Sequence, residues 1–460
     1  MDHSKQLGEV KVARLLLKFS IPAIIAMLVN ALYNVVDRIF VGNSVGPLGI
    51  AGITIGFPIM LIMMAFGMLI GLGANSLVSI KLGEGRKDEA ELILGNAMLL
   101  LIIVALLQSA AGLALLNPLL KIFGASGEVL PYARAYMQII LLGAIFQSLG
   151  FGMNNFIRGE GNPRVAMLTM LIGAALNAML CPLFIFGLGM GIRGSALATV
   201  ISQGVSAAWV LRYFFSGQST LKIRKKNLVL QKRVVGSILA LGSAPFALQM
   251  AASLVNTVMN KSLGFYGGDL AISGMGIVMS VLNLAMMPVI GINQGVQPII
   301  GYNYGAKKYD RVKEALKLAI TGATAIVCLG FVLVQVFPRQ IVGLFNSSDP
   351  ELLKLGVYFL RSFLIFLPLV GFQIVSSGYF QAVGKPKQSA FLTLSRQLIL
   401  LVPAILILPL FFKLHGVVMA GPVADLGSSM LTGFWITREI RRLGSNGQPV
   451  YVLNKAELTD

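Results

Sequence analysis

The sequence predicts an all-α integral membrane protein whose twelve transmembrane helices form two six-helix lobes around a central cleft. Three observations lead to this prediction. First, the chain of 460 residues is 56% hydrophobic and only 12% charged, whereas a soluble domain carries about 25% charged residues. Second, its apolar runs are long enough to span a bilayer, which takes about 20 residues. Third, the second half of the chain repeats the first.

Twelve apolar segments are bounded by charges or by glycine and proline clusters. They lie near residues 15–41, 48–80, 92–116, 132–157, 164–187, 193–215, 236–264, 270–301, 314–337, 353–383, 388–412 and 416–437. Helices are predicted rather than strands because a transmembrane barrel strand needs only about 10 residues of alternating pattern. We expect lobes at 1–215 and 236–440, a cytoplasmic linker at 216–235, and a mobile cytoplasmic tail at 441–460.

The repeat appears when the sequence is shifted by 223 residues. Ser243 and Pro245 then fall on Ser20 and Pro22, and the turn at 384–387 falls on the turn at 161–164. An even number of spans per repeat makes both halves point the same way, so an axis along the membrane normal should relate the lobes. Two parallel bundles with a cleft between them are the architecture that alternating access requires.

The basic residues orient the chain. If both termini are cytoplasmic, 27 of the 37 Lys and Arg residues fall in inside segments and only five in outside loops. This split follows the positive-inside bias, and it explains the net charge of +19 without a nucleic-acid partner. We therefore expect a multi-pass protein of a prokaryotic cytoplasmic membrane, surrounded by lipid, with both termini in the cytoplasm.

Asp37 is the only acidic residue in the spans of the first half. Asn30, Asn34 and Asp37 share one helical face, with Tyr33 beside them. A carboxylate inside a membrane costs roughly 2.5 to 3.5 kcal/mol on insertion scales, so it calls for a functional hypothesis. A cavity Asp can gain a proton in one state and lose it in another, as proton coupling needs. Alternatively, Asp37 lies near a wetted helix end, where charge is tolerated.

Four stretches of the chain are distinctive, namely LYNVVDRIFVG (32–42), FIRGEGNPR (156–164), MPVIGINQGVQPIIGYNYGAKK (287–308) and LSRQLILLVPAILILP (394–409). They resemble the multidrug and toxic compound extrusion (MATE) transporters. The likeness is greatest to the branch of the MepA pumps and DinF proteins. The resemblance implies cation-coupled antiport of amphipathic, usually cationic, drugs out of the cell, with the acid of helix 1 tied to proton or sodium coupling.

The resemblance also implies partners for Asp37. Asn154, Asn177 and Thr199 correspond to family positions around that acid, although buried polar side chains often only bond neighbouring helices. The family usually has a second Asp where this chain has Cys181. We interpret Cys181 as a packing residue, so single-site protonation of Asp37 is favoured over a two-carboxylate sodium site.

The second half keeps polarity but loses charge at the matching positions, because Asn256 and Asn260 fall on Tyr33 and Asp37. Arg396 either extends to the cytoplasm, which we favour, or binds ligand. Asp425 lies in the last helix and either pairs with a cation or forms a second protonatable site.

Methionines are concentrated in helices 2 and 8. Because their side chains adapt to varied shapes, they could line a drug-binding cavity. Alternatively, they could face lipid, since their spacing fits either face of a helix. We include in the expected substrate cavity Tyr33, Met60, Met63, Met64, Asn256, Asn260, Met275, Met279, Met286 and Arg396.

The sequence thus predicts a monomeric multidrug antiporter rather than an enzyme, with a proton favoured over sodium and no metal or other cofactor. The spans contain no His-rich cluster and no paired catalytic carboxylates. The glycines at 189, 191 and 194 match a dinucleotide fingerprint, but no strand precedes them. The alternative function is a lipid-linked saccharide flippase, in which Arg38, Lys261 and Arg396 would have to hold a pyrophosphate.

Overall fold

The computed structural model describes residues 5–125, 127–345 and 350–445, except for the side chains at positions 30, 33–36, 38, 39, 42, 47, 269, 444 and 445. Within these ranges the chain forms helices and no strands. Helices are expected here, because hydrocarbon leaves a spanning segment to satisfy its backbone hydrogen bonds internally. Most of our predicted tail, from residue 446 onward, lies outside the described residues.

The helices of the first half are α1 (Gln6–Glu9), α2 (Val12–Val45), α3 (Pro47–Gly83), α4 (Lys87–Ala114), α5 (Leu116–Ile122), α6 (Leu130–Leu142), α7 (Ala144–Gly159), α8 (Pro163–Pro182), η1 (Leu183–Gly187) and α9 (Gly191–Phe215). Those of the second half are η2 (Lys225–Asn227), α10 (Lys232–Gly305), α11 (Tyr309–Val336), α12 (Pro338–Gly343), α13 (Pro350–Phe363), α14 (Leu367–Ala382), α15 (Pro386–Leu394), η3 (Ser395–Leu401) and α16 (Val402–Ser445).

The described helices account for the twelve predicted spans. Nine continuous segments are long and apolar enough to cross a membrane, and the bent pairs α6–α7 and α13–α14 bring the number to eleven. The last of the nine is broken by non-helical backbone at Lys413 (φ 50°, ψ −131°), which divides it into two spans and gives twelve. A similar break at Gly268 (φ 65°, ψ −165°) already divides α10.

Two of the predicted helices are bent rather than straight. The segment predicted at 132–157 is α6 and α7, which meet at 55°, and the segment predicted at 353–383 is α13 and α14, which meet at 50°. At the second bend Pro368 lies in the first turn of α14. Proline cannot donate a backbone hydrogen bond to the preceding turn, so a helix breaks before it.

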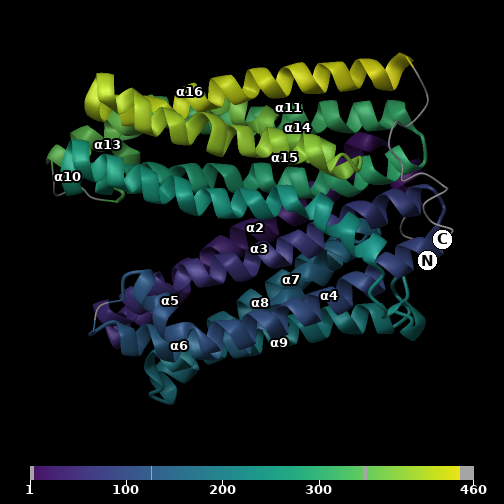
Figure 1. Ribbon diagram of the computed structural model, residues 1–460, viewed down its shortest axis with the longest axis horizontal. Coiled ribbons are helices and arrows are strands. Elements are labelled where there is room, and N and C mark those ends of the chain that lie inside the picture. The colour runs from purple at the N-terminus through teal and green to yellow at the C-terminus, as the bar shows by residue number, and fades with distance from the viewer. Residues whose placement is uncertain (1–4, 126, 346–349, 446–460) are drawn as a thin grey trace.

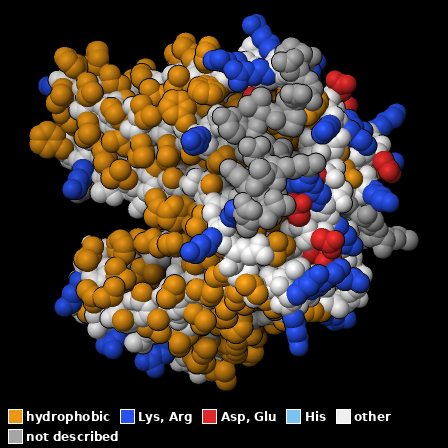
Figure 2. All heavy atoms as spheres, turned by 45° about the vertical axis from the view of Figure 1, so that its right-hand side comes forward, with side chains coloured by type: hydrophobic (Ala, Val, Ile, Leu, Met, Phe, Trp, Pro, Cys, Tyr) orange, Lys and Arg blue, Asp and Glu red, His pale blue; other side chains and the backbone are white. Residues whose placement is uncertain are grey.

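The helices form the two predicted lobes, which lie one above the other in Figure 1. The second lobe has one large core, which includes Phe359, Tyr379 and Phe380. The first lobe has two smaller cores, one around Leu94 and Phe156 and one around Tyr136 and Ile140. Figure 2 shows a hollow between two apolar bodies at one end of the molecule, whereas most Lys and Arg side chains gather at the other.

We call the closed end, which carries the linker and the turns after α3, α7 and the second half of α10, the basic end. There α3 and α10 approach so closely that a Cβ atom on Gly242 would overlap the carbonyl oxygen of Leu69, and one on Gly73 would overlap that of Ile238. Small residues let helix backbones meet in this way inside a membrane. The cleft is therefore shut at the basic end and open at the opposite end.

Candidate functional site

Asp37 lies on the outer part of α2, and it is buried in the first lobe with only 6% of its surface exposed. Ser195 Oγ donates a hydrogen bond to Asp37 Oδ1 at 2.8 Å, and Cys181 Sγ donates to the same oxygen at 3.2 Å. Ser195 belongs to α9 and Cys181 to α8. Three helices therefore meet at one carboxylate, and these donors offset part of the free energy lost when it leaves water.

Asn177 and Thr199 form the next polar contact on the same pair of helices. Asn177 Nδ2 donates to Thr199 Oγ1 at 3.2 Å, and both residues are buried. Each lies four residues from a donor of Asp37, since Asn177 precedes Cys181 on α8 and Thr199 follows Ser195 on α9. A spacing of four keeps residues on one helical face, so the two pairs form adjacent layers between α8 and α9.

The other residues expected near Asp37 are only partly placed. Asn154 on α7 is buried, and its Oδ1 has no hydrogen-bond partner among the described residues. The side chains of Tyr33 and Asn34 lie outside the described residues.

Neither donor to Asp37 is predicted from the sequence. Ser195 is not among the expected residues, although it shares a helical face with Thr199, four residues on. The interpretation of Cys181 as a packing residue is wrong, because its thiol contacts the carboxylate. Position 181 therefore lies beside Asp37 and offers it a weak S–H donor rather than a second charge.

The methionines do not form one surface. Met63 is 4% exposed in a core of the first lobe, and Met275 is 2% exposed in the core of the second. Both are therefore packed inside a lobe in this conformation. The half-buried methionines of the expected cavity are Met60, Met64, Met279 and Met286.

Asn256 and Asn260 are both exposed on the first half of α10. Polar side chains in a spanning helix face the bundle interior or a water-filled cavity rather than lipid. The repeat places apolar residues, Ala404 and Val418, on the two donors to Asp37, Cys181 and Ser195.

The second lobe holds an ion pair instead. Arg396 Nε donates to Asp425 Oδ1 at 2.6 Å, joining the π-helical segment η3 to α16. The side chains are 18% and 6% exposed, respectively. The expectation that Arg396 extends into the cytoplasm is therefore wrong, because a buried carboxylate on the neighbouring helix holds it. Asp425 pairs with a cation, as one of the two alternatives proposed.

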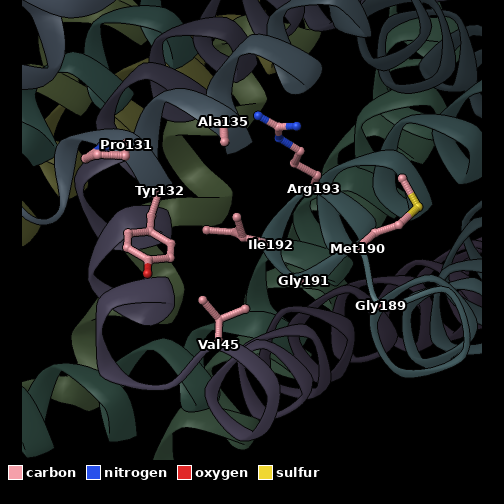
Figure 3. Close-up of a pocket in the computed structure, with 9 residues that line it drawn as sticks. All are labelled: Val45, Pro131, Tyr132, Ala135, Gly189, Met190, Gly191, Ile192 and Arg193. Atoms are coloured by element: carbon pink, nitrogen blue, oxygen red, sulfur yellow. The ribbon is translucent and has the colours of Figure 1, made fainter.

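A shallow cavity of about 380 Å³ lies at the open end of the first lobe, where α2, α6 and the start of α9 meet. Figure 3 shows Tyr132, Ile192 and Val45 around it, with Gly189 and Gly191 along one side. The glycine motif is thus a turn between helices, with positive φ at both of these glycines. Val45 lies eight residues beyond Asp37 on α2, so this cavity is about 12 Å farther out along the helix.

The chain matches the MatE family model twice, over residues 22–183 and 245–406. The two matched ranges are offset by 223 residues at both ends, which is the shift found from the sequence repeat.

Several known proteins are similar over nearly the full length. The "Multidrug export protein MepA" of Staphylococcus haemolyticus is 27% identical over 93% of this chain and 93% of that protein. A solved structure described as the MATE multidrug transporter DinF-BH in a complex is 42% identical, covers 94% of this chain and 97% of that one, and has a TM-score of 0.88. A structure described as the outward-facing conformation of a multidrug resistance MATE family transporter has a TM-score of 0.90 at 26% identity, covering 96% and 98% of the two chains.

The paired family match, the twelve spans in two lobes and the buried carboxylate of the first lobe agree with one another. The chain is a multi-pass membrane transporter that belongs to the MatE family of multidrug efflux proteins.

Proposed function

We propose that the protein exports amphipathic cationic compounds from a prokaryotic cell by alternating access, in exchange for a coupling cation. The proton is favoured over sodium as that cation. In this proposal the basic end, with both termini, faces the cytoplasm, and the protein works as a monomer.

The observation that carries the proposal is the buried carboxylate of Asp37, with donors from two other helices. When ionised, this group accepts both hydrogen bonds and attracts a positively charged drug. When the cleft opens to the outside, a proton can reach it. The neutral acid then loses its attraction for the drug, which leaves, and the proton is released after the lobes have reoriented.

The surroundings of Asp37 support a proton over sodium. The described donors to Oδ1 of Asp37 are a hydroxyl and a thiol, and the sulfur of a thiol is a poor ligand for a hard cation such as sodium. A hard cation needs several oxygen ligands. Because Cys181 stands at the position of the usual second Asp, the described residues of this site include a single carboxylate that could bind sodium.

The similar proteins support the substrate class, because their printed names describe multidrug export and a multidrug transporter. The flippase alternative gains no support. One of the three basic residues that it would need, Arg396, is already neutralised by Asp425.

The first prediction tests the carboxylate and the ion together. Membrane vesicles containing the protein are loaded with a cationic fluorescent dye, and efflux is followed under an imposed pH gradient, an imposed sodium gradient, or neither. We expect the pH gradient to drive efflux in the wild type. Asp37→Asn should reduce efflux to the level of vesicles without the protein, because an amide cannot exchange a proton.

The matched control is Asp310→Asn, which removes an exposed acid at the basic end. It should leave efflux unchanged. Normal efflux by Asp37→Asn would refute the role of the carboxylate. Efflux driven by the sodium gradient alone would show that sodium, and not the proton, is the coupling cation.

A further inference from the structure

The four-residue helix α1 is seated on the second lobe, although it begins the first half of the chain. Leu7 is fully buried in the core of the second lobe. Asn303 Nδ2 donates to Leu7 O at 2.9 Å, Lys308 Nζ donates to Gly8 O at 2.9 Å, and Arg311 Nη2 donates to Leu7 O at 3.1 Å. The carbonyl groups of α1 are therefore held by second-lobe side chains.

The same helix also reaches the first lobe. Gln6 Nε2 donates to Gly161 O at 2.6 Å, and Gly161 lies in the turn between α7 and α8. Lys18 Nζ in turn donates to Gln6 Oε1, which fixes the orientation of the amide. Because Gly161 and the seat of α1 belong to different lobes, the bond from Gln6 joins the lobes at the basic end.

The two attachments differ in strength. We call the second-lobe residues that bind α1, which are Asn303, Lys308 and Arg311, the seat of α1. Two of them are charged, and charge-assisted hydrogen bonds are roughly twice as strong as neutral ones. The contact with the first lobe comes from a neutral amide. A four-residue helix is also too short to persist without tertiary contacts. When the lobes separate at the basic end, α1 should therefore stay with the second lobe, and the bond from Gln6 to Gly161 should break.

We propose that α1 is a lock between the lobes, which holds the basic end shut and must release Gly161 before the cleft can open there. This inference deepens the alternating-access part of the proposed function and depends on it. It assigns Gln6 a role in setting the balance between the two conformations, without any contact with drug or coupling ion.

The second prediction measures this balance directly. Spin labels are attached at Lys87, at the start of α4, and Asp310, near the start of α11, which are exposed positions at the basic end of the two lobes. The distance between them is measured by pulsed electron paramagnetic resonance in lipid nanodiscs. Loss of one ordinary hydrogen bond in Gln6→Ala should raise the ratio of wide to narrow distances roughly 2- to 10-fold.

Glu9→Ala is the matched control, because Glu9 is exposed on the same short helix. It should leave the distance distribution unchanged. A second variant, Gly8→Leu, crowds the contact of α1 with the second lobe, since a Cβ atom on Gly8 would lie 2.9 Å from Tyr302 Cε1 and 3.1 Å from Lys308 Nζ, the side chain that binds Gly8 O. It should shift the distribution in the same direction and further than Gln6→Ala.

The proposal is overturned if Gln6→Ala and Gly8→Leu both give the distribution of the Glu9→Ala control. It is also overturned if either variant favours the narrow distances. The distance measurement needs neither a drug nor an ion gradient, so it is independent of transport. A wild type that fails to export dye, but whose lobes respond to Gln6→Ala, would therefore contradict the proposed function and leave the lock standing.

Discussion

Asp37 owes its environment to residues that are remote from it in the sequence. Ser195 and Cys181 come from α9 and α8, and both donate to one carboxylate oxygen. The second lobe carries Asn260 in place of the acid and Ala404 in place of the thiol. The ionisable groups described inside that lobe include Arg396 and Asp425, which neutralise each other. The two lobes therefore share a fold but differ in the chemistry at their centres.

The third prediction concerns Ser195. In Ser195→Ala, the ionised form of Asp37 loses its shorter hydrogen bond, while the protonated form loses less. Hydrogen bonds to charged groups contribute about 1.5 to 3 kcal/mol. Dye efflux under a fixed pH gradient should therefore slow by about tenfold in Ser195→Ala, measured in the same vesicles.

Ser195→Thr is the control, because it retains the hydroxyl group. Its efflux rate should stay close to that of the wild type. An unchanged efflux rate in Ser195→Ala would show that the hydroxyl does not stabilise the ionised carboxylate.

Among the connecting elements, the linker between the lobes is fastened to the first lobe by buried carboxylates. Glu160, in the turn after α7, is fully buried and accepts hydrogen bonds from Ser219 Oγ at 2.6 Å and from the backbone N–H of Leu221 at 3.2 Å. Glu91 binds the next stretch through Lys222 N and Arg224 Nε. Burial raises the pKa of Glu160 from 4.5 to about 7, because the charged form loses its hydration.

The fourth prediction follows from this pKa. A carboxyl whose pKa is higher in the docked state binds its proton more tightly there, so docking of the linker is favoured at low pH. The contribution is lost as pH rises from 4.5 to about 7, the two pKa values of Glu160. Amide hydrogen exchange at Leu221, corrected for the intrinsic effect of pH, should be several-fold faster at about pH 8 than at about pH 5.

Glu160→Gln imitates the protonated acid and should remove most of this difference. Asp310→Asn, at an exposed site, should retain it. Equal corrected rates at both pH values in the wild type would rule out Glu160 as the group that controls docking.

The molecule as a whole is closed at the basic end by direct contact between backbones of the two lobes. Gly242 on α10 faces the carbonyl oxygen of Leu69 on α3, and Gly73 faces that of Ile238. Arg158 on α7 adds a polar contact, donating to Gln294 Oε1 on α10 at 2.6 Å. In the proposed alternating access, the closed end would have to open and the hollow at the other end would have to close.

The fifth prediction tests this closure. Gly242→Ala places a methyl group on the carbonyl oxygen of Leu69, so α3 and α10 must separate. Overpacking of this kind costs about 1 to 3 kcal/mol, and it should move the distances between labels at Lys87 and Asp310 toward larger values.

Gly236→Ala is the matched control, because no atom lies within 4 Å of a Cβ atom added there on the same helix. Its distances should match those of the wild type. A Gly242→Ala protein with wild-type distances would show that the close approach of α3 and α10 does not hold the basic end shut.

The sequence alone determined the class of the protein, its twelve spans, the internal repeat and the presence of one acid, Asp37, within the spans of the first half. These follow from local properties. A segment in hydrocarbon must satisfy its own backbone, so its length and hydropathy predict a helix, and a charge within such a segment is costly wherever its neighbours lie. The two bends were not predicted, because a glycine or proline inside an apolar run does not reveal whether the helix continues straight.

Only the tertiary structure decided which side chains meet. Ser195 and Asp37 are 158 residues apart, and Asn303 lies 296 residues from the carbonyl group of Leu7 that it binds. These contacts depend on the rotation of each helix and on the packing of the lobes. Hydropathy does not specify either one, because lipid chains are as apolar as the leucine side chains that face them. The partners of Asp37, the pairing of Arg396 with Asp425 and the seat of α1 on the second lobe therefore had to come from the fold.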